Sequence, residues 1–282
     1  MNEIDKILFD AHTHLNFEEY SDKEREALAL DIENSAIRYV IDAGDSLSSS
    51  ERGLMNAHRY KWCYAAVGIH PEHAKDVNDE MLKAISELAK DDKCVAIGEI
   101  GLDFHYGKEY EKEQIDLFRK QIKMALSMNL PIMIHSRDAD QLTMDILKEE
   151  GAFDKKRTDL FERVQGYPDA RVQLHCYSGS PEFAMEYIRL GATISIGGPV
   201  TFKNGKKACS VVRTVPLERL LSETDSPFLT PEPFRGKKNK SEYVEHVVRR
   251  MAVLKGMEYK ETARALLMNG IRFFGIKDDG EK

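Results

Sequence analysis

The chain has 282 residues, which is long for an average domain but close to the length that a closed barrel of alternating strands and helices requires. Hydrophobic residues make up 42% of the chain, so it can bury a core without disulfides or a structural metal. The net charge of -7 and the pI of about 5.8 argue against a protein that binds nucleic acid through one broad basic face.

Short apolar runs alternate along the chain with longer segments of helical period. The eight apolar runs are residues 7–10, 39–43, 62–69, 94–99, 131–135, 172–175, 192–196 and 220–224. Several of them, such as CVAIGEIG from position 94, are apolar on both faces, which is typical of parallel strands that are covered on both sides.

The segments between these runs have the amphipathic period of helices. We expect helices at residues 23–38, 81–90, 112–128, 142–150, 241–254 and 258–274, and one that opens at Pro181 behind Ser180 as its N-cap. Eight strands separated by helices predict a single-domain (β/α)₈ TIM barrel over residues 1–276. An open doubly wound sheet is the structural alternative.

Two further segments are expected to lie outside the barrel core. Residues 151–170 are charged and longer than a connection between strand and helix needs, so we interpret them as a surface insertion with a short helix after Asp154. Residues 277–282 are expected to form a frayed tail.

The cysteines and the N-terminus predict the compartment. Cys63, Cys94, Cys176 and Cys209 form no CxxC pair, which is typical of reduced thiols in an intracellular protein. The N-terminus lacks an apolar leader and no apolar run is long enough to cross a membrane. We therefore expect a cytoplasmic protein without a membrane partner; the oligomeric state stays open.

Polar residues that can bind metals recur where the apolar runs end. They occur in DAHTH (10–14), GIHP (68–71), GEIGLD (98–103), IHSR (134–137), LHC (174–176) and ETDSP (223–227). In a parallel barrel the carboxyl ends of the strands converge on one mouth. A metal would explain this recurrence, because it gathers ligands that are far apart in sequence.

Each candidate ligand has an alternative structural interpretation. His12 and His14 are two residues apart in an extended segment and so point to one side, although a lone HxH is often a surface pair. Glu99 ends an apolar run, where it either binds metal or pairs with an arginine. His135 and His175 are either ligands or hydrogen-bonded core histidines, and Asp225 is either a ligand or the cap of a turn.

The chain resembles the TatD-type metal-dependent deoxyribonucleases, a family within the amidohydrolase-like barrel group. The resemblance rests on FDAHTHL, GIHPEH, GEIGLDFHY, IHSRDA, LHCYSG and ETDSPFLTP followed by PFRGKKN, and it runs from about residue 7 to about residue 274. The departure from the family is the segment 151–170, which contains none of these motifs.

The resemblance implies a site for two divalent metal cations, which could be Mg²⁺, Mn²⁺ or Zn²⁺. His12, His14 and Asp225 would bind one cation, and His135 and His175 the other. Glu99 would bridge both. The implied activity is hydrolysis of phosphodiester bonds in DNA, as a 3'-5' exodeoxyribonuclease.

Catalytic roles follow from the chemistry of a phosphodiester. We assign catalysis to Asp225, Glu99 and His70: Asp225 accepts a proton from the attacking water, and His70 either contacts a phosphate or leaving oxygen or positions a ligand. Glu223 and His73 are expected to support the ligands from behind.

The DNA partner would be held locally. We expect Arg137, Arg235 and Lys206 to contact phosphates, the last two from the basic segments 202–207 and 234–240, although such charged runs are often only solvated. Two other functions stay open: hydrolysis of an amide or aminoacyl ester bond on the same metals, and a barrel that serves only as a scaffold for interactions.

Overall fold

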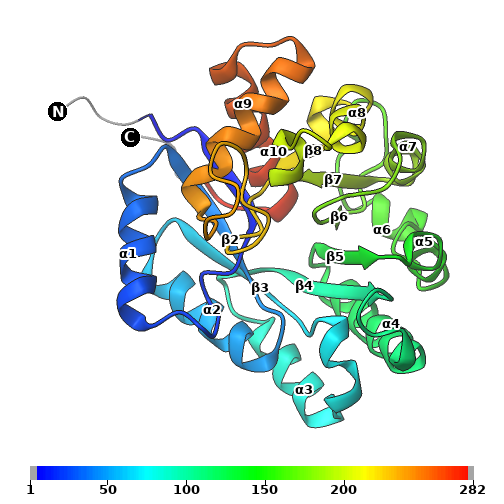
Figure 1. Ribbon diagram of the computed structural model, residues 1–282. Helices are drawn as coiled ribbons and strands as arrows, with labels where there is room; N and C mark the ends of the chain where they lie inside the picture. The colour runs from blue at the N-terminus through cyan, green and yellow to red at the C-terminus, as the bar shows by residue number, and fades with distance from the viewer. Residues whose placement is uncertain (1–4, 279–282) are drawn as a thin grey trace.

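Eight parallel strands form one sheet in the order of the chain, from β1 to β8, in a computed structural model that describes residues 5–278 (Figure 1). The strands are β1 (Leu8–Thr13), β2 (Ile37–Ala43), β3 (Cys63–Val67), β4 (Cys94–Asp103), β5 (Ile132–Arg137), β6 (Val172–Leu174), β7 (Ala192–Ile196) and β8 (Leu220–Ser222). A parallel bridge between Thr13 and Ser226 and a hydrogen bond from Ser222 Oγ to the carbonyl of Phe9 join the first strand to the last. The predicted (β/α)₈ barrel is confirmed, and the open sheet is excluded.

Helices connect the strands and surround the barrel (Figure 1). The α-helices are α1 (Asp22–Glu33), α2 (Leu47–Arg59), α3 (Asp79–Leu88), α4 (Glu111–Met128), α5 (Asp140–Glu149), α6 (Lys155–Thr158), α7 (Pro181–Leu190), α8 (Lys206–Thr214), α9 (Val244–Lys255) and α10 (Tyr259–Phe274). Short 3₁₀ helices are η1 (Pro71–Asp76), η2 (Lys108–Tyr110), η3 (Gly198–Thr201), η4 (Leu217–Arg219) and η5 (Ser241–Tyr243).

Two apolar clusters hold the barrel together. One fills its interior and continues onto α10, with Phe9, Met133 and Phe274 among its members. The other packs the outer faces of the strands against the surrounding helices, with Ile97 and Phe118 among its fully buried side chains. Strands that are apolar on both faces are needed for both clusters, as the sequence pattern predicts.

Two helices occur where none was expected. At α2, Ser46 forms a capping box with Ser49, so a run of serines that favours turns instead begins a helix. At α8, the helix begins at Lys206 directly after Gly205, so the basic segment 202–207 is only partly a loop. Tertiary packing outweighs the weak intrinsic preference at both places, because Leu54 and Val211 are buried.

Strand β4 is longer than expected. The sequence interpretation ended it at Glu99, but it continues to Asp103, after a shift of register against β5 between Ile97 and Ile100. At Gly101 the backbone has a φ of 149°, and a Cβ there would lie 1.9 Å from the carbonyl oxygen of His135. Only glycine allows β4 and β5 to approach this closely.

The segment 151–170 is only partly a solvated insertion. Its helix α6 spans one turn, as expected after Asp154, and Arg157 is buried there with its Nε donating to the Ala170 carbonyl and its Nη2 to that of Leu130. Most of the predicted tail, residues 279–282, lies outside the described residues.

All four cysteines are free thiols, and Cys63, Cys94 and Cys209 are buried. Within residues 5–278, no helix is both long and apolar enough to span a membrane.

Candidate metal centre

The structure gathers all six predicted ligands at the carboxyl ends of the strands. His12 lies in β1 and His14 directly after it, while Glu99 lies in β4 and His135 in β5. His175 follows β6, and Asp225 follows β8 with a φ of 57°, a left-handed conformation that turns the chain there. Residues from five strands thus face one mouth, the place at which barrel enzymes build their sites.

The first group contains His12, His14 and Asp225. The Nε2 atoms of the two histidines lie 3.1 Å apart, and Asp225 Oδ1 lies 3.7 Å from His12 Nε2 and 3.5 Å from His14 Nε2. Atoms that bind one cation, each about 2.0–2.2 Å from it, lie about as far from one another as these three atoms do. The three atoms therefore fit around a single ion.

The other ring nitrogens support this arrangement. His14 Nδ1 lies 2.8 Å from the carbonyl oxygen of Ala43, to which it can only donate, so Nε2 keeps its lone pair in the neutral ring. His12 Nδ1 faces Met133 Sδ at 3.0 Å. Two imidazole nitrogens that face one another across 3.1 Å, beside the Asp225 carboxylate, are a donor set that suits a cation.

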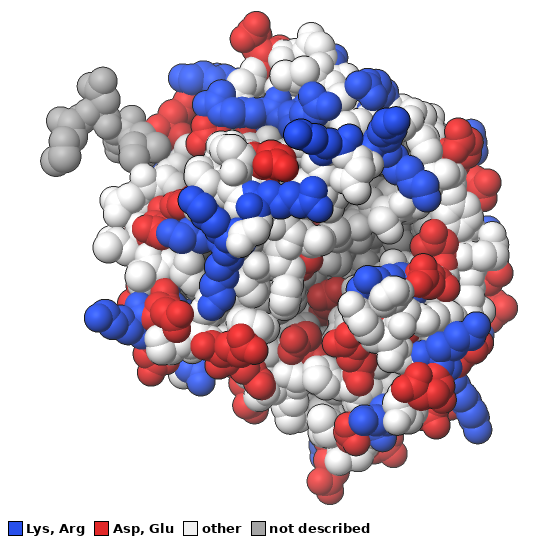
Figure 2. Space-filling view, in the orientation of Figure 1, with Lys and Arg blue, Asp and Glu red and all other residues white. Residues whose placement is uncertain are grey.

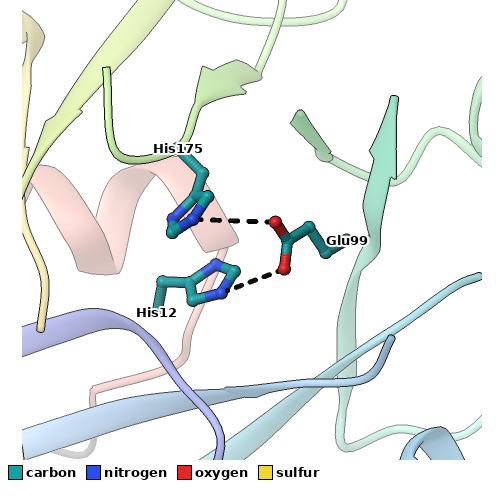
Figure 3. A group of neighbouring side chains, drawn as sticks. All are labelled: His12, Glu99 and His175. Atoms are coloured by element: carbon teal, nitrogen blue, oxygen red, sulfur yellow. Dashed lines mark ion pairs between the residues drawn. The ribbon is translucent and has the colours of Figure 1, made fainter. Parts of the chain in front are cut away.

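Glu99 links this group to further histidines with its two oxygens. Oε2 lies 3.3 Å from His12 Nε2, while Oε1 lies 3.6 Å from His175 Nε2 and 2.8 Å from His135 Nδ1. Figure 3 shows His12 and His175 side by side, each facing one oxygen of the carboxylate. This is the position that a bridging ligand would take between two cations.

The second group differs from the expected pair of His135 and His175. Their ring centroids are 6.5 Å apart, and the side chains that share close ligand atoms are His12, Glu99 and His175 in one set and His70, Glu99 and His135 in another. His135 also contacts Asp103 Oδ2 through Nε2 at 3.0 Å. The division of ligands between two cations stays a prediction.

Two carboxylates lie behind the histidines. Glu223, which the sequence interpretation placed there, is fully buried 3.0 Å from His175 Nδ1 and accepts from the Cys176 amide and the Ser195 hydroxyl. Asp103 was not assigned a role from the sequence. Its spacing of four from Glu99 would have indicated a shared face, had the strand been extended beyond Glu99.

His70 lies beside the centre and His73 does not. His70 is buried as the N-cap of η1, with Nε2 3.8 Å from Glu99 Oε1 and Nδ1 accepting from the Glu72 amide. His73 is exposed, and among residues 5–278 its side chain has no contact with a candidate ligand. The expected supporting role of His73 is therefore wrong, because the 3₁₀ turn that begins at Pro71 directs it to solvent.

The charges in the cluster are mutually dependent. Burial disfavours the charged form of every member, but neighbouring histidines still hold the pKa of Glu99 well below its usual value. The carboxylates likewise outweigh burial at three histidines and raise the pKa of His14 and His135 to about 9 and that of His175 to about 10. Where no carboxylate compensates enough, burial and a neighbouring histidine lower the pKa, as at His12 and at His70.

The three predicted substrate-binding cations are exposed and have no contact with a candidate ligand within the described part of the chain. The Arg137 guanidinium lies 4.7 Å from the centre of the Tyr106 ring, and that of Arg235 lies 4.2 Å from the centre of the Phe202 ring. Lys206 is the first residue of α8. Figure 2 shows Lys and Arg side chains gathered over the region in which Figure 1 places α8 and the segment after β8, next to a hollow in this face.

The fold and the clustered histidines and carboxylates define a metal-dependent hydrolase of the TIM-barrel type. The family model described as TatD related DNase matches residues 9–275, and the chain belongs to this family. The uncharacterized metal-dependent hydrolase YabD of Bacillus subtilis is 42% identical over 270 residues, which are 96% of this chain and all of that protein. YcfH of Escherichia coli, with the same description, is 37% identical over 74% of this chain and 72% of its own.

A solved structure of similar shape is that of YJJV, a TATD homologue from Escherichia coli. It has a TM-score of 0.85 and 29% sequence identity, and the match covers 96% of this chain and 99% of that one. These relatives support metal dependence and hydrolysis.

Proposed function

We propose that this protein is a metal-dependent deoxyribonuclease that removes nucleotides from DNA in the 3'-5' direction. The observation that carries the proposal is the pair of ligand groups joined through Glu99, in a barrel of the family described as TatD related DNase. A phosphodiester needs several positive charges near its oxygens, and this donor set can hold two cations close together.

The residues present fit divalent cations. Imidazole nitrogens and carboxylate oxygens together suit Zn²⁺ or Mn²⁺ better than Mg²⁺, which prefers oxygen alone, although we keep all three as candidates. His12, His14 and Asp225 would hold one ion, His135 and His175 the other, with Glu99 between them. The chemistry supplied there would be polarisation of water and neutralisation of charge on the phosphoryl group.

Two side chains are placed to act on protons. Asp225 is the more exposed of the two carboxylates in the cluster, and histidines outweigh its burial and lower its pKa, so it is ionised and can accept a proton from water. His70 accepts from the Glu72 amide at Nδ1, which leaves a proton on Nε2 of the neutral ring. His70 can therefore donate to a phosphate or leaving oxygen.

Substrate contacts would come from the exposed cations around the mouth. Arg137 directly follows Ser136 at the end of β5, two positions from His135, and is held against Tyr106. Arg235 and Lys206 are exposed, in the segment after β8 and at the start of α8, and Figure 2 shows Lys and Arg side chains gathered over this region. A local group of this kind can bind a phosphate backbone even in a protein of net negative charge.

The test is cleavage of a single-stranded DNA oligonucleotide labelled at its 5' end, in Mg²⁺, Mn²⁺, Zn²⁺ or chelator. The variants are Glu99→Ala and, as a matched control, Glu87→Ala, since Glu87 is an exposed glutamate on α3 that pairs with Lys90. We expect a ladder that shortens from the 3' end in wild type and Glu87→Ala, and no ladder in Glu99→Ala or in chelator.

One result of this experiment would contradict the proposal. A wild-type protein that binds two cations but cleaves no DNA with any of them would overturn the nuclease proposal. Hydrolysis of amide or aminoacyl ester substrates would then be measured on the same protein.

A further inference from the structure

A second concentration of charge lies at the opposite end of the barrel. It is formed by Arg157, Arg171, Arg219, Arg272 and Asp169, which we call the arginine cluster. Arg171 directly precedes β6 and Arg219 directly precedes β8, whereas His175 and Asp225 follow these strands. The arginine cluster and the metal centre are therefore separated by the length of the strands.

The arginine cluster contains too few carboxylates to neutralise its buried arginines. Arg219 is 0% exposed, Arg157 4% and Asp169 2%, so these charges are withdrawn from water. The charge of Asp169 acts on all four arginines, and that of the half-buried Glu218 acts on Arg272. At least two positive charges are left without a counter-charge among the described residues.

The guanidinium groups also hold unused donors. Their used N–H groups reach backbone carbonyls of Leu130, Tyr167, Pro168, Ala170 and Glu218. Five buried nitrogens have no hydrogen-bond acceptor within residues 5–278, namely Arg157 Nη1, Arg171 Nε, Arg219 Nε, Arg219 Nη1 and Arg272 Nε, although Arg219 Nη1 lies 3.4 Å from Asp169 Oδ1. Buried donors of this kind are rare unless a ligand or water accepts from them.

The four arginines differ in exposure. Arg171 and Arg272 are intermediate in exposure, whereas Arg219 and Arg157 lie beneath the surface. The positions of Arg157 and Arg171 are set by the Phe161 ring, whose centre lies 4.8 Å and 4.3 Å from the two guanidinium carbons. Burial lowers the pKa of all four guanidinium groups, which remain cations at neutral pH.

We propose that the arginine cluster binds a phosphate-type oxyanion at a site separate from the metal centre. A phosphate group carries about two negative charges and several acceptor oxygens, which match both the excess charge and the unused donors. The anion could be free inorganic phosphate or the phosphate of a nucleotide, which share this chemistry. The proposal does not depend on the reaction at the metals.

The experiment is a calorimetric titration of inorganic phosphate into the full-length protein, first with its metals and then in chelator. Phosphate that binds at the metals is lost in chelator, whereas phosphate at the arginine cluster is retained. The variants are Arg171→Gln and Arg272→Gln, whose partial exposure favours folding, and Arg249→Gln is the control because Arg249 is an exposed arginine on α9. Circular dichroism establishes that each variant is folded.

We expect phosphate to bind wild type and Arg249→Gln in chelator, and to bind Arg171→Gln and Arg272→Gln at least tenfold more weakly. A parallel titration with deoxyadenosine monophosphate distinguishes the sources: equal affinity indicates free phosphate, and at least tenfold tighter binding of the nucleotide indicates a nucleotide phosphate. In wild type and Arg249→Gln, phosphate should also raise the melting temperature relative to chloride of equal ionic strength, and by more than in Arg171→Gln and Arg272→Gln.

Two results would overturn the proposal. One is the absence of phosphate binding in chelator, which would mean that no phosphate accepts from these nitrogens. The other is equal phosphate affinity in wild type, Arg171→Gln and Arg272→Gln, which would leave the arginines only the structural role of fastening segment 151–170 to the barrel.

Discussion

At the level of single residues, the candidate metal centre depends on carboxylates that hold histidines in place. His135 is oriented between Glu99 Oε1 and Asp103 Oδ2, at 2.8 and 3.0 Å. Asp103 is fixed in turn, because its backbone amide donates to Gln114 Oε1 and its Oδ1 accepts from the amides of His105 and Tyr106. Hydrogen-bond partners of this kind, which lie behind a metal ligand, set the direction of the ligand's lone pair.

The variant Asp103→Asn tests whether the contact between Asp103 and His135 supports metal binding. We expect metal affinity and activity to fall by about 10–100-fold, because an amide orients and polarises the imidazole less well than a carboxylate. The measurement is metal binding by calorimetry together with cleavage of the oligonucleotide. Asp138→Asn is the matched control, since the exposed Asp138 pairs with the exposed His105, and an equal loss in both variants would contradict the prediction.

The same residues predict a pH dependence for the metal-free protein. The pKa values of His14, His135 and His175 are raised from about 6.5 to about 9–10, so the folded state binds these protons more tightly than the unfolded state. Their contribution to stability is complete below the unfolded pKa and is lost as the pH rises through the folded values. The buried Asp10, whose pKa is raised to about 7, acts in the same direction at lower pH.

We therefore expect the melting temperature of the metal-free protein to fall between pH 7 and pH 10. Metal cations replace the protons on these histidines, so the melting temperature of the metal-loaded protein should fall much less between pH 7 and pH 10. Thermal unfolding monitored by circular dichroism, with and without chelator, measures both curves. Parallel curves would show that these histidines are not the groups that bind the metal.

At the level of elements, the close approach of β4 and β5 places Glu99 and His135 together. Gly101 adopts a φ of 149° in β4, and a Cβ there would meet the His135 backbone. Gly166 also has a left-handed conformation, with a φ of 78°, but no atom lies within 4 Å of the position that a Cβ would take there. A substitution at Gly166 therefore measures the cost of the backbone conformation alone. A substitution at Gly101 adds the cost of a steric contact with the His135 backbone.

Gly101→Ala should lower the free energy of unfolding by about 3 kcal/mol or more, because the added methyl group forces the strands apart. Gly166→Ala should cost only about 1 kcal/mol, the penalty of a left-handed conformation. Urea denaturation measures both values. Similar losses in the two variants would mean that the strands separate at little cost.

At the level of the whole molecule, the charge is uneven although the net charge is -7. Exposed Lys and Arg side chains gather over α8 and the segment after β8, beside the hollow in the face of Figure 2. Screening confines such a field to about one Debye length, so only a local basic surface can hold a nucleic acid on this protein.

The double variant Arg235→Gln, Lys206→Gln should weaken binding of single-stranded DNA uniformly across sequences. Each lost phosphate contact should reduce the slope of log K against log salt concentration by about 0.7. Fluorescence anisotropy at several salt concentrations gives the slope. Arg59→Gln, Lys90→Gln removes the same charge from exposed residues on or after helices elsewhere, and an identical slope change there would indicate a net-charge effect only.

The sequence alone predicted the barrel, the approximate positions of its strands, and the six candidate ligands that the structure gathers at one mouth. Buried parallel strands must be apolar on both faces, and the ligands stand out against such runs. Local patterns also identified Ser180 as a helix cap, and its side chain accepts from the Phe183 amide. They predicted Glu223 behind the ligands, where it contacts His175.

Only the tertiary structure determined which side chains from distant segments come into contact. The shift of register in β4 extends that strand to Asp103 and brings Asp103 to His135, whereas the turn of η1 directs His73 away. The buried arginines of segment 151–170 and its neighbours likewise appear in the sequence as an ordinary charged surface. A one-dimensional pattern records local period and composition, but register shifts and contacts between distant segments depend on how the whole barrel packs.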